Sequence, residues 1–291
     1  MGAARLRAVA LDMDGTALNS AHALTQGTVE AIRRAEAAGV RVIIATGRPA
    51  MSLQPFVDQL ALPGPLPAVC FNGACAALLR AGAPGPESVL FTQGLAPEAA
   101  RRVLALADQR GWCASCCHPA RSVAAPRSDK QERLLAAYEG MEGLRQARAA
   151  SSGELLAVGE APLKIVCLSS DPDGDAAAAR QALPEGLVHV IAAEQHVEFV
   201  DPGVSKGLTL ERLCGTLLGT PLEQVVAFGD NHNDEDMLRL VGEGVAMSNA
   251  KESVKAAAAR SSEWSNDEEG VARELRALLD SGELAGPPGE E

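Results

Sequence analysis

The sequence predicts an α/β protein with a mostly parallel sheet and a second, smaller α/β domain inserted into it. Short apolar runs typical of buried strands alternate with longer segments of helical periodicity, which is the order that builds a parallel sheet. The alternation resumes between residues 94 and 193 in a stretch long enough for a separate domain. The chain has 291 residues, of which 47% are hydrophobic, and this is sufficient for one large α/β domain or two smaller ones.

The first 92 residues contain the clearest elements. Gly39 follows the first helical segment, as glycine often does after a helix, and a Pro/Gly-rich run at 62–67 ends the second. We expect, in chain order, a strand at 9–11, a helix at 26–38, a strand at 42–45, a helix at 50–60, and strands at 68–71, 76–80 and 88–92.

We expect the larger domain to consist of residues 1–83 and 194–280, and the inserted domain of residues 84–193. The insert begins with a helix after Pro97 and a cysteine-containing strand, and the chain returns to the larger domain at 198–200. The tail, 281–291, is rich in Gly, Pro and Glu and is expected to be disordered. The remaining expected elements are strands at 163–168, 187–191, 225–229 and 244–247, and helices at 175–183, from 206, at 235–241 and at 271–279.

The formal net charge of -12 limits the partners of this protein. Nucleic acid and anionic membrane surfaces are disfavoured as main partners, because like charges repel. No apolar run reaches the ~20 residues that a membrane-spanning helix requires. Few residues precede the first expected strand, which leaves no room for a secretory signal. We therefore expect a cytoplasmic protein, and the sequence leaves its oligomeric state undetermined.

The seven cysteines give a second constraint from composition. An odd number in a chain of this length favours reduced thiols over a disulfide framework. Cys113, Cys116, Cys117 and His118 are close in sequence and suggest either a zinc site or exposed reactive thiols. No second pair follows at the spacing of structural zinc sites, so zinc is the weaker interpretation. The sequence leaves the role of these four residues open.

The segment 9–16, VALDMDGT, is the most informative part of the chain. Its apolar residues predict a buried strand, and Asp12 and Asp14 follow at the carboxyl end, where open α/β sheets bind ligands. Two desolvated carboxylates require a nearby cation, and a hard dication with oxygen ligands would supply one. The pattern indicates a carboxylate nucleophile beside a metal ion. A strand that runs into an acidic turn is the alternative.

Three later segments favour the functional interpretation. The segment 42–48, VIIATGR, is a second apolar strand that ends in a hydroxyl and a glycine. The segment 203–207, GVSKG, places Lys206 at the start of an apolar-periodic helix, and the segment 225–234, VVAFGDNHND, is a third strand followed by a carboxylate cluster. Each alone is also typical of a polar cap. Together and in this order they supply the groups that phosphoryl transfer needs.

These four motifs resemble those of the haloacid dehalogenase superfamily of phosphatases, and most closely its Cof-type branch. Three further segments carry the resemblance to the branch: FNGA at 71–74, AMSNA at 246–250 and NDEEGVA at 266–272. The resemblance extends over nearly the whole chain. It implies a Rossmann-like, mostly parallel sheet as the core, an inserted α/β cap domain and Mg²⁺ as the cofactor.

The resemblance also implies roles for the acidic residues. Asp12 matches the family nucleophile, which forms an aspartyl-phosphate, and Asp14 matches the general acid and base. The metal would be held by side-chain oxygens of Asp12 and Asp230 and by the backbone carbonyl of Asp14. Asp234, one helical turn further on, would lie in the outer shell and orient Lys206 or a water. An acid at a helix N-terminus is the alternative for Asp234.

Three residues would hold the phosphoryl group. Thr46 would hydrogen-bond a phosphoryl oxygen, helped by the backbone N–H groups around Met13 and Gly47. Lys206 would supply a positive charge to both the phosphate and Asp12. A solvated helix N-terminus is the alternative for Lys206, but a cation there opposes the helix dipole, which favours an anionic neighbour.

Three more residues are candidates for substrate contacts. Asn233 matches a family residue that reaches the phosphate or the substrate. Arg48 and Asn72 follow the ends of expected strands, and the resemblance suggests substrate or cap contacts for both. Plain turn chemistry is the alternative for these two residues.

The candidate residues predict a magnesium-dependent phosphomonoester hydrolase that acts on a small phosphorylated metabolite, and the family resemblance makes sugar phosphates the leading class. Two alternatives stay open. A sugar phosphomutase would use the same aspartyl-phosphate, and a non-catalytic protein on this fold would only bind phosphorylated metabolites. The presence of the complete acidic set and of Lys206 disfavours the second alternative.

Overall fold

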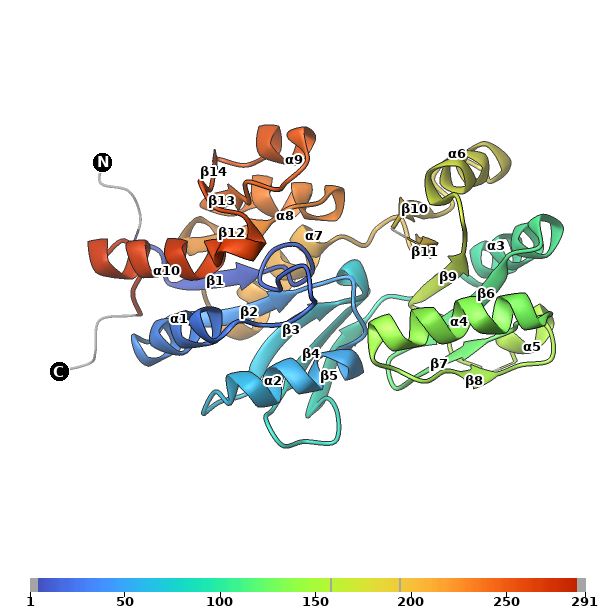
Figure 1. Cartoon of the computed structure of the whole chain (residues 1–291), viewed down its shortest axis with the longest axis horizontal. Helices are drawn as coiled ribbons and strands as arrows, with labels where there is room; N and C mark the ends of the chain where they lie inside the picture. Colours follow the sequence, from blue (N-terminus) through green and yellow to red (C-terminus); the bar gives the residue numbers. More distant parts are fainter. Residues whose placement is uncertain (1–4, 158, 194, 287–291) are drawn as a thin grey trace. The chain divides into compact units, whose positions relative to one another are not determined.

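The structure is a computed structural model that describes residues 5–157, 159–193 and 195–286. The chain divides into two compact units (Figure 1). The first unit contains the residues up to Leu90 and those from Ser205 onward, and the second contains Phe91–Val204. The second unit is therefore an insertion in the first, and its limits lie later in the chain than the expected 84 and 193.

The first unit is built on an eight-stranded sheet. Its strands, in spatial order, are β14 (Arg260–Ser261), β13 (Glu243–Ala246), β12 (Val225–Gly229), β1 (Ala8–Leu11), β2 (Arg41–Ala45), β3 (Leu66–Cys70), β4 (Cys75–Leu79) and β5 (Ser88–Thr92). Neighbouring strands are parallel from β14 to β3, and β4 is antiparallel to β3. The predicted mostly parallel sheet is thus confirmed.

Two groups of helices pack around this sheet: α1 (Gln26–Ala37), α2 (Gln54–Leu60) and α10 (Gly270–Ser281), and α7 (Lys206–Leu213), α8 (Glu235–Leu240) and α9 (Glu252–Ala257). In the first group α1 contacts both α2 and α10, and in the second α8 contacts both α7 and α9 (Figure 1). The N-cap of α1 is Thr25, whose side chain accepts a hydrogen bond from the backbone of Thr28.

The central strands explain the continuous apolar runs of the sequence. β1 and β12 are buried at every position, because helices cover both faces of a parallel sheet. In the register of the sheet, Leu11 lies opposite Ile44 of β2 and Phe228 of β12. The carboxyl ends of the three strands therefore coincide at one edge, and the residues that follow them are neighbours.

In its described residues, the second unit contains a six-stranded, mostly antiparallel sheet with four helices. Its strands, in spatial order, are β10 (His189–Ala192), β11 (His196–Val200), β9 (Lys164–Leu168), β6 (Cys113–His118), β7 (Arg121–Ala124) and β8 (Ala147–Arg148). Its helices are α3 (Pro97–Arg110), α4 (Asp129–Glu142), α5 (Ser152–Leu155) and α6 (Pro172–Ala182). β7, α4, β8 and α5 were not predicted, and α4 has few buried residues, so its apolar pattern is weak.

The two faces of this second sheet differ in chemistry. Ile165 and Phe199 belong to an apolar cluster on one face. Because side chains alternate along a strand, the intervening residues Lys164, His196 and Glu198 lie on the other face. The prediction that 198–200 returns to the first unit was wrong, since β11 pairs with β9 and β10 in the second sheet. The sequence of a short strand with alternating polar and apolar residues does not indicate which sheet the strand joins.

Two further predictions need correction. The helix expected at 50–60 is a 3₁₀ turn at Ala50–Leu53 followed by α2. The tail is ordered as far as residue 286: Leu284 is buried, and the backbone N–H of Ala285 donates to the carbonyl of Leu6. Disorder was expected from composition alone, which does not register this pairing with the start of the chain. Residues 287–291 lie outside the described residues.

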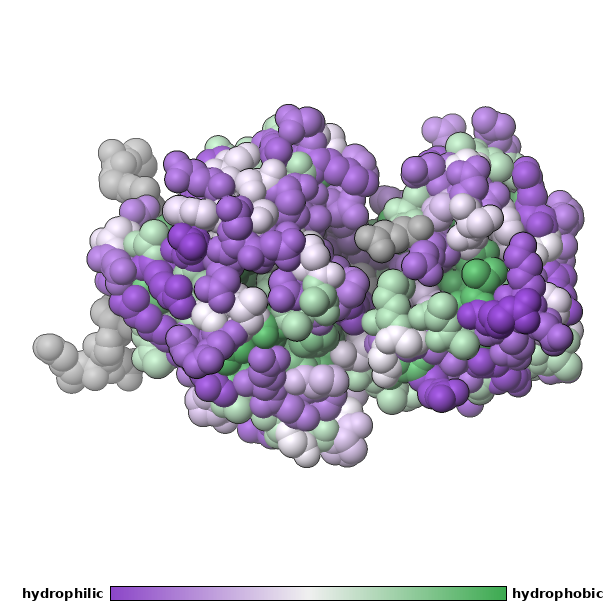
Figure 2. All heavy atoms as spheres, viewed as in Figure 1, coloured by the Kyte–Doolittle hydropathy of each residue, from purple (hydrophilic) through white to green (hydrophobic). Residues whose placement is uncertain are grey.

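Hydrophilic residues cover most of the face shown in Figure 2. The large apolar side chains that are exposed among the described residues are Val89, Leu90, Leu134, Leu208, Leu217 and Leu240. None of the described helices combines the length and the apolar character needed to cross a membrane.

Candidate active site

A buried lysine and three carboxylates form the centre of the candidate site. Lys206, at the start of α7, has a fully buried side chain. Its Nζ donates to Asp12 Oδ1 at 2.6 Å and to Asp234 Oδ1 at 2.7 Å. Asp12 follows β1, and Asp234 lies just after β12, so the ammonium group links two strand ends. The structure thus brings together residues that are far apart in the sequence, as their order predicted.

Negative charge exceeds positive charge in this cluster. Asp12, Asp230 and Asp234 each place a carboxylate oxygen within 4.8 Å of the others. Burial and the charge of Asp234 raise the pKa of Asp12 well above its ordinary value, despite the neighbouring Lys206. Burial and the charge of Asp234 likewise raise the pKa of Asp230 to about 6. One ammonium does not balance three carboxylates, of which two are buried and one is partly buried, so this oxygen-rich set suits a hard divalent cation.

The two oxygens of Asp234 have structural partners of their own. Oδ1 accepts from Lys206, and Oδ2 accepts from the backbone N–H groups of Asp230 and Asn231 at 3.0 Å each. The carboxylate therefore shapes the turn after β12 and fixes the lysine at the same time. This geometry agrees better with the expected outer position of Asp234 than with direct binding of a metal.

The position of Lys206 depends on a close approach between two segments. Ser205 caps α7 by accepting a hydrogen bond from the backbone of Leu208. Gly73 lies against the carbonyl of Ser205, has a φ of +105°, and its carbonyl accepts from the Thr209 hydroxyl at 2.8 Å. A Cβ at Gly73 would collide with the Ser205 carbonyl. Only glycine combines this backbone angle with this approach.

Asp14 lies beside the cluster and has different partners. Its carboxylate forms a two-point ion pair with Arg48, from Nε to Oδ2 and from Nη2 to Oδ1, both at 2.6 Å. Its Oδ1 also lies 3.1 Å from Nδ1 of His22. Burial alone would raise the pKa of Asp14, but the hydrogen bonds and charge of Arg48 outweigh it and lower the pKa. Asp14 is thus an ionised carboxylate here, as Arg–carboxylate geometry favours.

The remaining candidates form a connected polar group next to Arg48. The hydroxyl of Thr46 accepts from the backbone N–H of Arg48 at 3.1 Å, which leaves its O–H as a donor for another group. The backbone N–H of Asn72 donates to the Thr46 carbonyl, and its Oδ1 accepts from Asn233 Nδ2 at 2.9 Å. A Cβ at Gly47 would lie 3.0 Å from Asn72 Oδ1, so Gly47 belongs to the same group.

Three residues outside the predicted set of site residues contact the site in the structure. The Thr16 hydroxyl donates to Asp230 Oδ1 at 3.1 Å, Asn249 Nδ2 donates to the Gly15 carbonyl at 2.8 Å, and His22 contacts Asp14. Thr16 and Asn249 lie inside quoted motifs, so motif membership was an available signal. His22 lies in no motif, and no sequence signal pointed to it.

The cysteines of β6 do not behave as exposed reactive thiols. Cys113, Cys116 and Cys117 are all buried, and burial raises the pKa of Cys113 to about 11. Adjacent side chains on a strand point to opposite faces, and Cys116 belongs to the apolar cluster of the second unit. Cys116 and Cys117 therefore do not converge on one site. The proposal of exposed thiols was wrong because the strand lies in the middle of its sheet.

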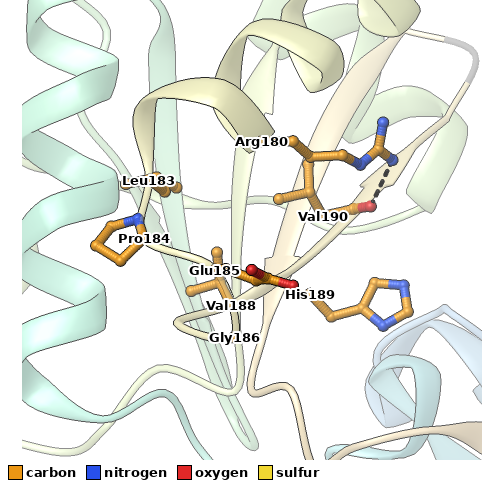
Figure 3. Close-up of a pocket in the computed structure, with 8 residues that line it drawn as sticks. All are labelled: Arg180, Leu183, Pro184, Glu185, Gly186, Val188, His189 and Val190. Carbon is orange, nitrogen blue, oxygen red and sulfur yellow. Dashed lines mark hydrogen bonds between the residues drawn. The ribbon is translucent and has the colours of Figure 1, made fainter.

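A cavity of about 500 Å³ lies in the second unit, at the end of α6 (Figure 3). It is lined by Arg180, Leu183, Pro184, Glu185, Gly186, Val188, His189 and Val190. The Arg180 guanidinium donates to the Val190 carbonyl at 2.8 Å, as the dashed line in Figure 3 shows. The cavity contains none of the expected catalytic residues, so its size is no indication of the reaction site.

The fold and the site together define a phosphoryl-transfer enzyme of the α/β class. Strand ends of one parallel sheet bring together a carboxylate, a buried lysine and an acidic cluster whose oxygens could hold a cation. The chain belongs to the haloacid dehalogenase-like hydrolases, whose family model matches residues 9–275. Within that family it is a phosphatase with a cap domain.

Individual relatives support this assignment. The chain is 28% identical to 5-amino-6-(5-phospho-D-ribitylamino)uracil phosphatase YitU of Bacillus subtilis, over 92% of this chain and 96% of that protein. It is 30% identical to pyridoxal phosphate phosphatase YbhA of Escherichia coli, over 87% of this chain and 91% of that protein. A solved haloacid dehalogenase-like hydrolase of B. subtilis matches with a TM-score of 0.80 and 25% identity, over 94% of this chain and all of that one. The family predicted from the motifs is confirmed.

Proposed function

We propose that this phosphatase is a magnesium-dependent phosphomonoesterase that forms an aspartyl-phosphate on Asp12 and acts on small phosphorylated metabolites. The observation that supports this most directly is the contact of the buried Lys206 with Asp12 and Asp234, next to Asp230. A carboxylate at a strand end, fixed by an ammonium group, is positioned to act as a nucleophile.

In the first step an oxygen of Asp12 attacks phosphorus, and the bond from phosphorus to the leaving oxygen breaks. Asp14 donates a proton to that leaving oxygen, so the product departs as an alcohol. Lys206 holds Asp12 and places positive charge beside the phosphoryl oxygens. The Thr46 hydroxyl and the backbone around Gly47 donate hydrogen bonds to the same oxygens. Asp14 must therefore carry a proton at this stage and exchange its contact with Arg48.

In the second step a water attacks phosphorus, and the bond from phosphorus to Asp12 breaks. Asp14 takes a proton from the water, which restores the proton it gave away. The products are inorganic phosphate and the free Asp12 carboxylate. The same residue thus serves as acid and base in the two halves of the reaction.

The side chains of Asp12 and Asp230 and the backbone carbonyl of Asp14 would hold Mg²⁺. When bound, the ion would supply positive charge that reduces the repulsion between the Asp12 carboxylate and the anionic substrate. Thr16 donates to Asp230 and so fixes one of these oxygens. Asp234 would stay outside the ligand set, because it is engaged with Lys206 and the backbone.

Arg48, Asn72 and Asn233 would contact the substrate. Sugar phosphates remain the leading class from the family resemblance. Two relatives are named for phosphorylated heterocycles, a ribitylaminouracil phosphate and pyridoxal phosphate, and these belong among the candidates.

Phosphate release from a panel of sugar, nucleotide and cofactor phosphomonoesters tests the proposal, with magnesium and with a chelator. We expect magnesium-dependent release from a few related compounds. The Asp12→Asn variant is the matched control, because it preserves shape and removes the nucleophile. Near-normal turnover by that variant, folded as judged by circular dichroism, would contradict the nucleophile assignment. Turnover that requires an added sugar bisphosphate would instead identify a mutase.

A further inference from the structure

His22 contacts the carboxylate that we propose as general acid and base. Its Nδ1 lies 3.1 Å from Asp14 Oδ1, and both side chains are partly exposed, at 49% and 41%. An ionised carboxylate only accepts hydrogen bonds, so Nδ1 carries the hydrogen and donates it to Asp14. His22 touches neither Asp12 nor Asp230 among the contacts of the described residues.

The loop around His22 is closed by hydrogen bonds and has an unusual backbone conformation. His22 has a φ of 54°, a left-handed conformation that few non-glycine residues adopt and that histidine adopts more readily than most. Asn19 Oδ1 accepts from the backbone N–H groups of Ala21 and Ala23, which closes the loop. Ser20 donates from its backbone and its hydroxyl to Asp267, at 2.7 and 2.6 Å. These bonds fix the backbone from which the His22 ring reaches Asp14.

Among the described residues, the side chains of Arg48 and His22 contact the Asp14 carboxylate, and only His22 is expected to stay with it during the reaction. The Arg48 guanidinium holds both oxygens of Asp14. An arginine also binds phosphate oxygens in two-point geometry, so an anionic substrate competes with Asp14 for Arg48. Once Arg48 contacts the substrate, His22 is the side chain that still holds Asp14 Oδ1.

We infer that His22 is a positioning residue, which holds Asp14 through Oδ1 so that its other oxygen delivers the proton to the leaving group. The inference rests on the proposed function, because it assigns Asp14 the acid and base role. A purely structural role, in which the ring only stabilises the loop, is the competing explanation.

The two explanations differ in how the effect depends on the leaving group. An alkoxide is a poor leaving group and needs a proton from Asp14, whereas p-nitrophenolate departs without one. Loss of positioning therefore reduces kcat/KM for an alkyl phosphate more than for p-nitrophenyl phosphate. A loop that is merely destabilised reduces both by the same factor.

Two variants separate the side chain from the backbone conformation. His22→Gly removes the donor and tolerates the left-handed backbone, and His22→Asn tolerates the same backbone while keeping an N–H donor near the position of Nδ1. Any difference between the two variants therefore reports on the hydrogen bond to Asp14 and not on strain in the loop.

The experiment measures kcat/KM of the full-length protein, with magnesium, for p-nitrophenyl phosphate and for the alkyl phosphate of the panel that the wild type hydrolyses fastest. We expect His22→Gly to lower the alkyl phosphate value about tenfold and the p-nitrophenyl phosphate value less than about threefold, from the usual strength of a hydrogen bond to a charged group. His22→Asn is expected to restore most of the lost alkyl phosphate activity. In an Asp14→Asn background, His22→Gly is expected to produce no further loss.

Equal losses on the two substrates, no loss at all, or failure of His22→Asn to restore activity would overturn the role of His22 and leave the proposed function intact. Absence of any magnesium-dependent turnover by the wild type would overturn the proposed function itself. If His22→Gly does not fold, His22→Ala, which removes the same donor, is measured on the two substrates. A loss larger for the alkyl phosphate than for p-nitrophenyl phosphate supports positioning, and equal losses overturn it.

Discussion

Replacing Glu198 by glutamine tests how strongly a buried ion pair stabilises the second unit. Lys164 Nζ lies 2.6 Å from Glu198 Oε1, and the two side chains are 1% and 7% exposed. His196 Nε2 lies 3.0 Å from the same oxygen. Burial alone would raise the pKa of Glu198, but the charge of Lys164 and the hydrogen bond from His196 outweigh it, and the pKa is lowered to about 2.

The expected loss follows from this pKa. A lowering from the ordinary 4.5 to about 2 corresponds to about 3 kcal/mol of stability at neutral pH, at about 1.4 kcal/mol for each tenfold change in proton affinity. Glutamine preserves the shape and removes the negative charge that contacts the buried Lys164 ammonium, and loss of one charge of a buried ion pair typically costs about 3–5 kcal/mol. We therefore expect Glu198→Gln to lower the free energy of unfolding by about 3 kcal/mol at pH 7.

The stability that Glu198 contributes depends on pH with a definite sign. A carboxyl group whose pKa is lowered in the folded state stabilises the protein above its ordinary pKa of 4.5, and this contribution is lost as the pH falls through about 4 toward 2. The difference between the wild type and Glu198→Gln should therefore shrink to about 1 kcal/mol at pH 3.

Urea unfolding followed by tryptophan fluorescence measures this difference. The chain has two tryptophans, and a Trp264→Phe background leaves Trp112, whose buried ring lies 6.5 Å from that of Phe199 in the second unit. The matched control is Glu98→Gln, which removes an exposed carboxylate paired with arginines on α3, and little change is expected. An unchanged midpoint in Glu198→Gln at pH 7, or an equal difference at pH 3 and pH 7, would refute the reasoning.

Three other variants probe the catalytic unit. Lys206→Met should lower kcat/KM for p-nitrophenyl phosphate by about 10³ or more, since it leaves the carboxylate cluster without its ammonium group, and a loss below tenfold would contradict this. Asp14→Asn should lower steady-state kcat for p-nitrophenyl phosphate by about 10²–10⁴, while a burst of p-nitrophenol remains in stopped-flow traces. Unchanged steady-state turnover would count against the role of Asp14 as the base. Gly73→Ala should lower the free energy of unfolding in urea by about 1–3 kcal/mol and remove most of the activity. Gly82→Ala is the control, because φ is also positive there but the surroundings are open. Equal effects of the two substitutions would argue against the close approach of Gly73 to Ser205.

Local patterns in the sequence were sufficient for much of the fold and for the centre of the site. Apolar runs that end in Asp12, Thr46 and Asp230 indicate buried parallel strands, and the carboxyl ends of such strands meet at one edge. Lys206 at a helix start required an anionic neighbour, and the structure supplies two. These inferences succeeded because each depends on a few adjacent residues and on the geometry that parallel sheets share.

Other features were decided only by the tertiary structure. The sheet to which β11 belongs, the partners of Asp14 and the buried pair of Lys164 and Glu198 all depend on residues distant in the chain. His22 shows the difference most clearly: its backbone angle is set by a local loop, but its contact with Asp14 exists only because that loop folds back over the end of β1. Side-chain pairing requires a position and a direction in space, and the sequence alone specifies neither.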